Sequence, residues 1–236
     1  MDQLKGKVAI VTGASHGIGR GIALAFGKEG ANVVIAARTA AGLKETADAI
    51  VAAGGAVEIV PTDVTVEAQI DNMFTRTMAR FGRLDILVNN AGVFNGAPLD
   101  EMTTEAWDQV INTGVRAAFI CTRAAFHIMK KQKAGRIINI GSISAQRTRM
   151  NNSAYTSNKF GLTGLTHSTA LEGRDHGITC GILHPGVVHT RGPSKEPGME
   201  LEEIAAAAVY MAAAGPKVNV FELIQLPIDQ LYLGRG

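Results

Sequence analysis

Three polar side chains in the second half of the chain have the types and the spacing of a proton-transfer site. Ser142 precedes Tyr155 by thirteen positions, and Lys159 follows Tyr155 by four. Because positions i and i+4 of a helix are neighbours, the phenol and the ammonium are expected to share one helical face. A hydroxyl, a phenol and an ammonium in one place could deliver a proton to a carbonyl oxygen and stabilise the charge that develops on it.

A glycine-rich stretch near the N-terminus could bind phosphate. Residues 12–19 read Thr-Gly-Ala-Ser-His-Gly-Ile-Gly and follow an apolar, β-branched run. The spacing of Gly13, Gly17 and Gly19 differs from the G-x-G-x-x-G pattern, but such glycines equally allow a tight turn and a close backbone approach. The helix N-terminus that follows attracts a pyrophosphate. A plain strand-to-helix turn is the alternative for these glycines alone. With the proton-transfer residues, they predict a nicotinamide cofactor site.

Strand and helix patterns alternate along the whole chain. Short β-branched runs lie at 8–11, 33–36, 57–60, 86–88, 137–140, 178–183 and 218–226. Segments with helical periodicity lie at 18–29, 40–53, 66–82, 104–131, 153–176 and 200–214. This alternation predicts an α/β fold of Rossmann type, a doubly wound parallel sheet of about seven strands with helices on both faces. We expect residues 1–236 to form a single dinucleotide-binding and catalytic domain.

The composition excludes several classes of protein. The net charge of +2 is too small to indicate a nucleic-acid partner. No apolar run reaches the length of a membrane span and no signal peptide is recognisable, so we expect a cytoplasmic protein without a membrane partner. Cys121 and Cys180 are the two cysteines, and their apolar surroundings indicate buried free thiols. No metal site is predicted.

Taken in order, these motifs resemble those of the short-chain dehydrogenase/reductase family in its single-domain form. Besides the glycine loop, the segment Asn89-Asn90-Ala91-Gly92 resembles the second motif of the family. Pro185-Gly186-Val187-Val188-His189-Thr190 resembles the segment that touches the nicotinamide end, and Asp63-Val64 resembles the pair that meets the adenine. The resemblance covers nearly the whole chain and is weakest after about Thr190. Carbonyl and 3-oxoacyl reductases are the members that the chain is most similar to.

The resemblance implies a role for each catalytic candidate. Tyr155 would be the proton donor in reduction and the acceptor in oxidation, and Ser142 would hydrogen-bond the substrate oxygen. An ordinary tyrosine titrates near pH ~10 and is a poor base at neutral pH, and the charge of Lys159 would favour a tyrosinate. Lys159 would also hold the nicotinamide ribose. The predicted cofactor-binding residues are Gly13, Ser15, His16, Gly17, Ile18, Gly19, Arg38, Asp63, Val64, Asn90, Ala91, Gly92, Tyr155, Lys159, Pro185, Gly186, Val188 and Thr190.

Two of these residues also have a purely structural interpretation. Asp63 could cap the helix that follows it, and Asn90 could satisfy backbone groups of a turn. Both structural roles can coexist with cofactor binding.

Arg38 favours NADP(H) over NAD(H). A site that prefers NAD usually has an acid at the end of the second strand, whereas the 2′-phosphate of NADP is bound by a nearby Arg. Here Ala37 stands where the acid is expected and Arg38 follows it. A guanidinium pairs with phosphate oxygens, and His16 could add partial positive charge. The alternative is an exposed Arg before a helix.

Gly114 departs from the family pattern. The resemblance implies at this position a helix-breaking Asn that holds a water linking Lys159 to solvent. Asn112 does not replace it, because two residues turn a helix by about 200°. We expect an irregular helix with an exposed carbonyl near Gly114, and a higher kcat in Gly114→Asn. A second departure is Asn158, where the family commonly has Ser.

The predicted activity is NADP(H)-dependent interconversion of a carbonyl and an alcohol in a small molecule. We expect Asn95, Gly96, residues 144–150 and the 191–200 loop to line the substrate pocket. Arg147 and Arg149 could meet an anionic substrate or face solvent. Ser144 and Asn152 stand where hydroxybutyrate-type enzymes have His and Lys, which disfavours that activity. The alternatives are a 3-oxoacyl-carrier reductase and an NADP-binding regulator or scaffold, which only Gly114 favours.

The resemblance also implies a homotetramer or homodimer. The Ala-rich helix at 204–214 would allow a close helix approach between subunits, and the apolar strand at 218–226 follows it. We expect the tail at 227–236 to pack on a neighbouring subunit.

Overall fold

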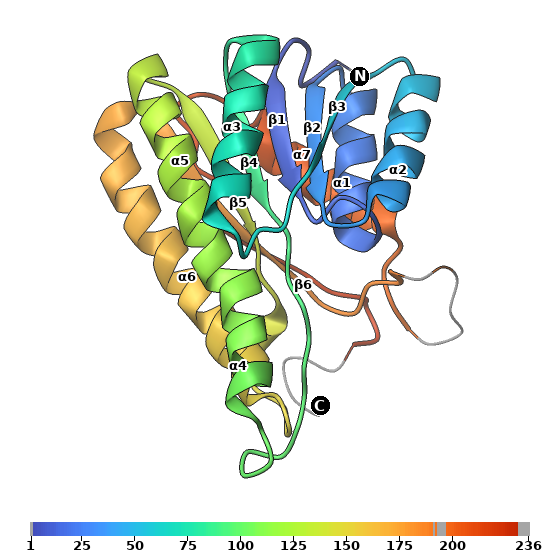
Figure 1. The fold of residues 1–236 in the computed structure, drawn as a ribbon, viewed down its shortest axis with the longest axis vertical. Helices are drawn as coiled ribbons and strands as arrows, with labels where there is room; N and C mark the ends of the chain where they lie inside the picture. Colours follow the sequence, from blue (N-terminus) through green and yellow to red (C-terminus); the bar gives the residue numbers. More distant parts are fainter. Residues whose placement is uncertain (1, 191, 193–196, 231–236) are drawn as a thin grey trace.

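Seven parallel strands form one sheet in the computed structural model, which describes residues 2–190, 192 and 197–230. The strand order is β3-β2-β1-β4-β5-β6-β7, and every neighbouring pair is parallel (Figure 1). The strands are β1 (Val8–Thr12), β2 (Asn32–Ala37), β3 (Ala56–Pro61), β4 (Ile86–Asn89), β5 (Gly135–Ile140), β6 (Ile178–Pro185) and β7 (Glu222–Gln225). The predicted doubly wound fold is confirmed.

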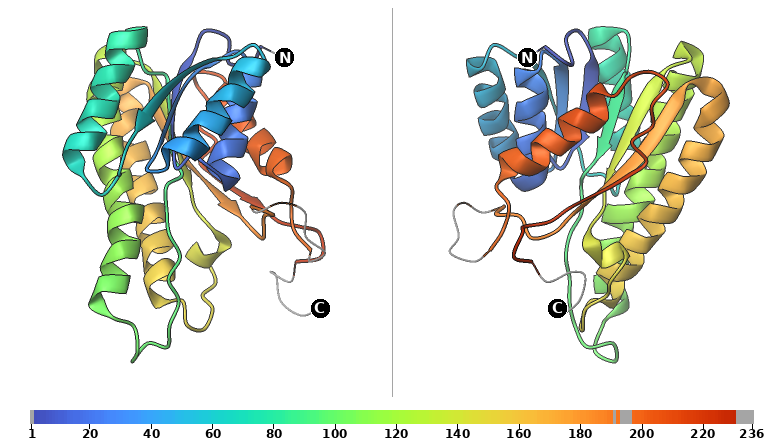
Figure 2. Two further views of the ribbon diagram at one scale, coloured as in Figure 1. Left: turned by 45° about the vertical axis from the view of Figure 1, so that its right-hand side comes forward. Right: turned by 180° about the vertical axis from the view of Figure 1, so that it is seen from behind.

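Helices cover both faces of the sheet (Figure 2). They are α1 (Gly17–Lys28), α2 (Ala40–Ala52), α3 (Glu67–Phe81), α4 (Thr104–Ile111), α5 (Ala117–Gln132), α6 (Ser153–Gly173) and α7 (Leu201–Ala213). Three short helices are the π turn η1 (Asn112–Arg116) and the 3₁₀ turns η2 (Ile143–Ala145) and η3 (Arg174–His176). The side chains of α1, α2 and α7 share one core, and those of α3 and α5 share another.

The central strands explain why both faces are covered. β1 is buried along its whole length, as expected for a parallel strand between two helical layers. Its residues alternate between the cores: Ala9 and Val11 pack with α1 and α7, whereas Ile10 packs with α3 and α5. Because all strands run in one direction, the loops that follow β1 to β6 lie at the same edge of the sheet, where such folds bind ligands.

Two elements differ from the prediction. The helix expected over 104–131 is divided by the π turn η1. The last strand is only Glu222–Gln225, because residues before it are used in other contacts: Val218 N–H bonds Gly215, and Asn219 bonds the carbonyl of Cys180. No helix in the described part of the chain is long and apolar enough to cross a membrane.

Both cysteines are buried and unpaired, as predicted. Burial raises the pKa of the Cys121 thiol to about 12, and it raises the pKa of the Cys180 thiol as well. Neither thiol is therefore ionised at neutral pH.

Candidate active site

The glycine loop between β1 and α1 has no room for side chains. Gly13 and Gly17 have φ angles of +67° and +56°, which favour glycine. A Cβ on Gly19 would overlap the side chain of Asn90 and the carbonyl of Gly13, and one on Gly17 would meet Thr190 at 3.3 Å. The loop therefore forms a backbone cradle at the N-terminus of α1, as a pyrophosphate requires.

Asn90 ties the second motif to this loop. Its amide nitrogen donates to the carbonyls of Thr12, at 2.9 Å, and Gly13, at 3.2 Å. The hydroxyl of Thr12 accepts bonds from the backbone N–H groups of Asn90 and Ala91. The structural interpretation of Asn90 is thus confirmed, and its bonds hold the loops after β1 and β4 together.

A pocket opens where the loops after β1, β2, β3 and β4 meet. Its lining holds the predicted loop and adenine-side residues and one from η1: Gly13, Ser15, His16, Ala37, Arg38, Thr39, Thr62, Asp63, Val64, Ala91, Gly92, Val93 and Thr113. Sequence reasoning missed Thr113. It lies beside Gly114, where an irregular helix is expected, but the sequence does not indicate that this turn borders the pocket.

Asp63 is held in place by the turn after β3. Its Oδ1 atom accepts bonds from the Thr65 N–H and hydroxyl, at 2.9 and 2.7 Å. These bonds lower the pKa of the Asp63 carboxyl, and the positive charge of Arg38 adds to the effect. Because α3 has Val66 as its N-cap, Asp63 forms an Asx turn instead of capping the helix.

Two exposed basic side chains flank this pocket. Arg38 is exposed, and among the described residues its guanidinium makes no hydrogen bond. His16 is the N-cap residue of α1, but its side chain makes no capping bond and instead lies 3.1 Å from the Ser15 hydroxyl. Both are therefore available to an anionic group.

The segment after β6 returns to the glycine loop. Thr190 faces Gly17, and Val188 packs against the core shared by α1 and α7. The N–H of Val187 donates to the side chain of Gln230 at 2.8 Å. The described part of the tail, residues 227–230, thus contacts its own chain; residues 231–236 lie outside the described residues, and the expected packing of the tail on a neighbouring subunit stays a prediction.

Ser142 follows β5 with its hydroxyl proton available. Its Oγ accepts a bond from the N–H of Ser144 at 3.1 Å. Since that bond uses only a lone pair, the O–H remains free to donate to a substrate oxygen. The Ser142 residue is almost buried, at 9% exposure, so its position is set by the protein.

Tyr155 and Lys159 lie on one face of α6, as the spacing predicts. The Nζ atom of Lys159 is 5.4 Å from the centre of the Tyr155 ring and donates to the carbonyl of Ile140, at the end of β5, at 2.7 Å. Phe94 packs edge-on against Tyr155, with ring centres 5.5 Å apart. No described residue bonds the Tyr155 hydroxyl, which is therefore available to a substrate.

A buried histidine supports Ser142 from behind. The Nδ1 atom of His184 lies 3.2 Å from the Ser142 nitrogen and 2.9 Å from its carbonyl oxygen. On its other side, Nε2 lies 3.3 Å from the Glu222 carboxylate, which also accepts a bond from Gln146. Burial lowers the pKa of His184 below its ordinary value of 6.5. Sequence reasoning missed this residue, whose only signal is a histidine inside an apolar strand.

The expectations about Gly114 are only partly correct. The helix is irregular there, since Gly114 is in the middle of η1. Its carbonyl is not exposed, however: Gly114 is buried and the carbonyl accepts a bond from the Ala117 N–H. The structure argues against the expected gain in kcat from Gly114→Asn, because a Cβ at this position would collide with the carboxamide of Asn158 unless that side chain moves.

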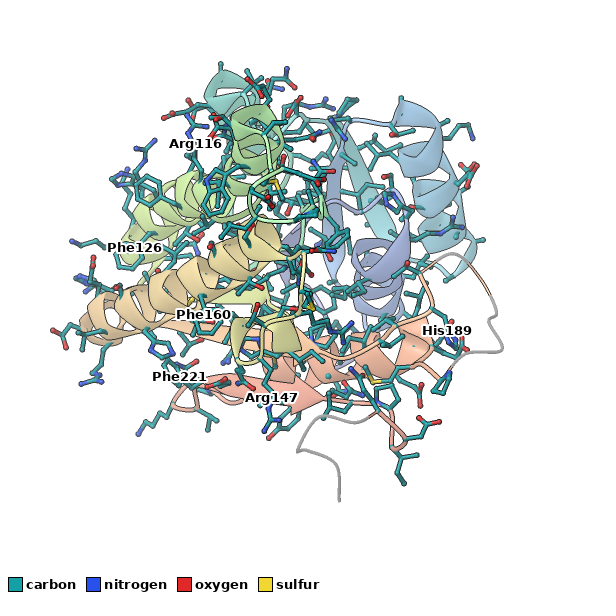
Figure 3. All side chains as sticks on the ribbon, turned by 90° about the horizontal axis from the view of Figure 1, so that it is seen from below. Arg116, Phe126, Arg147, Phe160, His189 and Phe221 are labelled. Carbon is teal, nitrogen blue, oxygen red and sulfur yellow. The ribbon has the colours of Figure 1, made fainter. Side chains whose placement is uncertain are left out.

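The expected substrate-side residues are spread around the mouth of the site. The side-chain amide of Asn95 donates to the side chain of Gln109 on α4 at 2.8 Å. Arg147 and Arg149 are exposed, and Figure 3 shows Arg147 well separated from His189 at this end of the molecule. In the 191–200 loop, residues 191 and 193–196 lie outside the described residues. The described part of the chain has no cluster of three or more His, Cys, Asp or Glu residues able to hold a metal ion.

Comparison with known proteins identifies relatives over most of the chain. A family model described as short chain dehydrogenase matches residues 7–199. An uncharacterised oxidoreductase of Bacillus subtilis is 43% identical over 188 residues, which cover 80% of this chain and 73% of that protein. A 3β-hydroxysteroid dehydrogenase of Eggerthella lenta is 36% identical over 231 residues, which cover 90% and 88%.

A solved structure is also similar to this chain over nearly its whole length. A metagenomic short-chain oxidoreductase in complex with NADP is 35% identical and superposes with a TM-score of 0.88, covering 97% of this chain and 100% of that chain. The family model matches most of the chain, and the solved structure shares its fold. The chain belongs to the short-chain dehydrogenase family and is an oxidoreductase.

Proposed function

We propose that this protein uses NADP(H) to interconvert a carbonyl and an alcohol in a small apolar substrate, with Tyr155 as the proton donor and acceptor. The observation that carries the proposal is the placement of Tyr155, Lys159 and Ser142. The Lys159 ammonium lies beside the Tyr155 ring and is bonded to the end of β5, which Ser142 follows shortly after. A protein that only binds a cofactor has no need for this arrangement.

The residues present fit a nicotinamide dinucleotide. The glycine loop, packed too closely for side chains at Gly13 and Gly19, presents its backbone at the N-terminus of α1, where a pyrophosphate would bind, and the pocket beside Asp63 and Arg38 would take the adenosine end. Bound there, the cofactor supplies or accepts the hydride.

The chain's own residues handle the proton and the charge. Ser142 donates its hydroxyl hydrogen bond to the substrate oxygen, because its acceptor site already binds Ser144. The Tyr155 hydroxyl protonates that oxygen during reduction and takes the proton back during oxidation. The ammonium of Lys159 stabilises the tyrosinate that remains. The bond from Lys159 to Ile140 holds this charge in place.

Arg38 supports the preference for NADP(H). It is exposed at the pocket, next to Ala37, where an acid would repel a phosphate. A guanidinium binds a 2′-phosphate with charge-assisted hydrogen bonds. The NADP complex of the metagenomic relative is consistent with this proposal.

Exposed apolar side chains near Tyr155 support an apolar substrate. Phe94 contacts the tyrosine ring and is 63% exposed, and Met150 in the loop before α6 is 92% exposed. Such side chains suit the rings or chains of a ketone better than a small hydroxy acid. The steroid activity in the name of the Eggerthella lenta relative makes hydroxysteroids and oxosteroids suitable first substrates.

We also propose a homo-oligomer. Phe119 on α5, Phe160 on α6 and Tyr210 on α7 are each about half exposed or more; Figure 3 labels Phe160 on α6. A second copy would cover such side chains. Light scattering of the purified protein measures the assembly; a monomer at micromolar concentration would contradict it.

One experiment tests the enzymatic proposal. NADPH and NADH oxidation is followed against ketones, aldehydes, diketones and oxosteroids, with the wild-type protein and Tyr155→Phe. We expect turnover with NADPH and its loss in Tyr155→Phe at unchanged NADPH affinity. Tight NADPH binding without turnover of any substrate would favour a binding protein, and turnover retained in Tyr155→Phe would refute the role of Tyr155.

A further inference from the structure

Gly114 and Asn158 occupy one small space between two helices. Asn158, on α6, is buried, with 1% of its surface exposed. A Cβ built on Gly114 would lie against all three terminal heavy atoms of the Asn158 side chain, far closer than the ordinary carbon contact of about 3.5–4 Å. The carboxamide therefore fills the volume in which a side chain of residue 114 would begin.

The same carboxamide replaces a helical hydrogen bond. In a regular α-helix the N–H of Val115 would bond the carbonyl of Ile111. In η1 this N–H instead donates to Oδ1 of Asn158, at 2.6 Å. The backbone donor that the π turn displaces is thus satisfied from a neighbouring helix, which is how irregular helical turns are kept in place.

This contact joins the two functional parts of the molecule. Thr113, two residues before Val115, lines the cofactor pocket. Asn158 directly precedes Lys159, whose ammonium lies against Tyr155. Gly161, also on α6, lies beside Val115, since a Cβ there would make an ordinary contact with it at 3.4 Å. A shift of η1 therefore moves the pocket wall relative to the residues proposed to transfer the proton.

We propose that Asn158 is a positioning residue that fixes the π turn against the helix of Tyr155 and Lys159, in place of a side chain at position 114. The carboxamide enters this space from α6 and not from η1. The missing side chain at Gly114 leaves the room that it occupies. The catalytic consequence of this inference rests on the proposed function. That Asn158 takes the place of a side chain at position 114 can be tested by Tm and NADPH affinity, without turnover.

A double-mutant cycle tests the exchange. The variants are Gly114→Asn, Asn158→Ser and the two together, compared by Tm, NADPH affinity and kcat. We expect each single variant to lower Tm, one by collision and the other by leaving the Val115 N–H unpaired. We expect kcat to fall about tenfold or more in each, as displaced catalytic groups lose rate. The double variant should recover most of both losses.

A matched pair of glycines controls for helix propensity. A Cβ on Gly164, also on α6, would meet no neighbouring atom within 4 Å, so Gly164→Ala should leave Tm unchanged or raise it. Gly114→Ala should lower Tm in the wild type and raise it in the Asn158→Ser background. Equal effects of Gly114→Ala in both backgrounds would overturn the proposal.

A pH profile separates positioning from simple packing. If Asn158 positions the proton-transfer residues, the pH dependence of kcat shifts in Asn158→Ser and returns in the double variant. An unchanged kcat and profile in Asn158→Ser would refute the positioning role, as would losses that merely add in the double variant. If the wild type shows no turnover, the proposed function fails, but recovery of Tm and NADPH affinity in the double variant would still support the exchange.

Discussion

The two ends of the candidate site are held in different ways. At the adenosine end, Arg38 and His16 are exposed and project from loops. At the catalytic end, Ser142 and Lys159 are buried and each is bonded to backbone, while Asn158 is buried beside them. The protein therefore organises the catalytic end in advance, whereas the ligand must order the side chains at the adenosine end.

This difference predicts how each end responds to substitution. Changes at the catalytic end displace groups that act on the transition state and should lower kcat. Changes at the adenosine end remove contacts made equally in the ground state and transition state and should raise the KM of the cofactor.

After the loss of turnover expected for Tyr155→Phe, the largest effect is expected for Ser142→Ala. In the proposed mechanism its hydroxyl stabilises the charge that develops on the substrate oxygen, and losing one such donor costs about 10²–10³ in kcat. NADPH affinity should not change, because in this mechanism the hydroxyl bonds the substrate and not the cofactor. Steady-state kinetics measure kcat, and NADPH fluorescence titration measures the affinity. A loss of NADPH affinity as large as the loss in kcat would contradict the proposed difference between the two ends of the site.

Arg38→Ala should show the opposite pattern. Loss of a charge-assisted bond to the 2′-phosphate, worth about 1.5–3 kcal/mol, should raise the KM for NADPH about 10- to 100-fold while kcat changes little. The KM for NADH, which lacks this phosphate, should stay the same and serves as the control. The wild-type KM for NADPH should rise with salt. If the wild type and Arg38→Ala each used NADPH and NADH equally well, Arg38 would have no role in selecting the cofactor.

His184 makes the catalytic end sensitive to acid. Burial lowers its pKa, an effect to which Lys159 and His167 add and which Glu222 opposes. The unfolded chain therefore binds this proton more readily, so stability is lost as pH falls from about 6.5 toward the lowered folded pKa. His184→Asn should lower kcat by up to about tenfold and flatten the decline in Tm between pH 6.5 and 5. If Tm fell equally between pH 6.5 and 5 in the wild type and in His184→Asn, the acid sensitivity would come from other titratable groups.

The smallest effect is expected for Gln230→Ala. The variant removes one bond to Val187, near the nicotinamide end, and a single neutral hydrogen bond contributes about 0.5–1.5 kcal/mol. The KM for NADPH should rise several-fold with kcat nearly constant. Ile228→Ala, in the same tail but fully exposed, is the matched control. If both variants behave alike, the tail contact has no role in cofactor binding.

The sequence predicts the fold and the order of the site well, for a physical reason. Alternating apolar runs specify parallel strands, and parallel strands bring their following loops to one edge. Gly13, Asn90 and Ser142 were predictable because each follows the end of a strand by one or two residues. The i, i+4 spacing likewise places Tyr155 and Lys159 on one helix face.

The contacts that sequence reasoning missed join residues distant along the chain. Asn158 and Val115 are 43 positions apart, and Ser142 and His184 are 42 apart. No local pattern records that a carboxamide on one helix fills the space left by a glycine on another. The periodicity of 104–131 also gives no sign of η1, because a π turn adds a single residue to an otherwise regular helix; only Gly114 indicates an irregularity there.

The Gly114–Asn158 contact has a consequence for how such chains diverge. Suppose that one carboxamide, from either helix, must fill this space. Two carboxamides would then collide, and a protein with no carboxamide there would leave the Val115 N–H without a partner. Each single step between the two arrangements then passes through a poorer protein, although both end points work, which is sign epistasis between the two positions. Scoring each position by itself would count Gly114 as a loss of function, whereas scoring the two together would recognise the same chemical group supplied from a different helix.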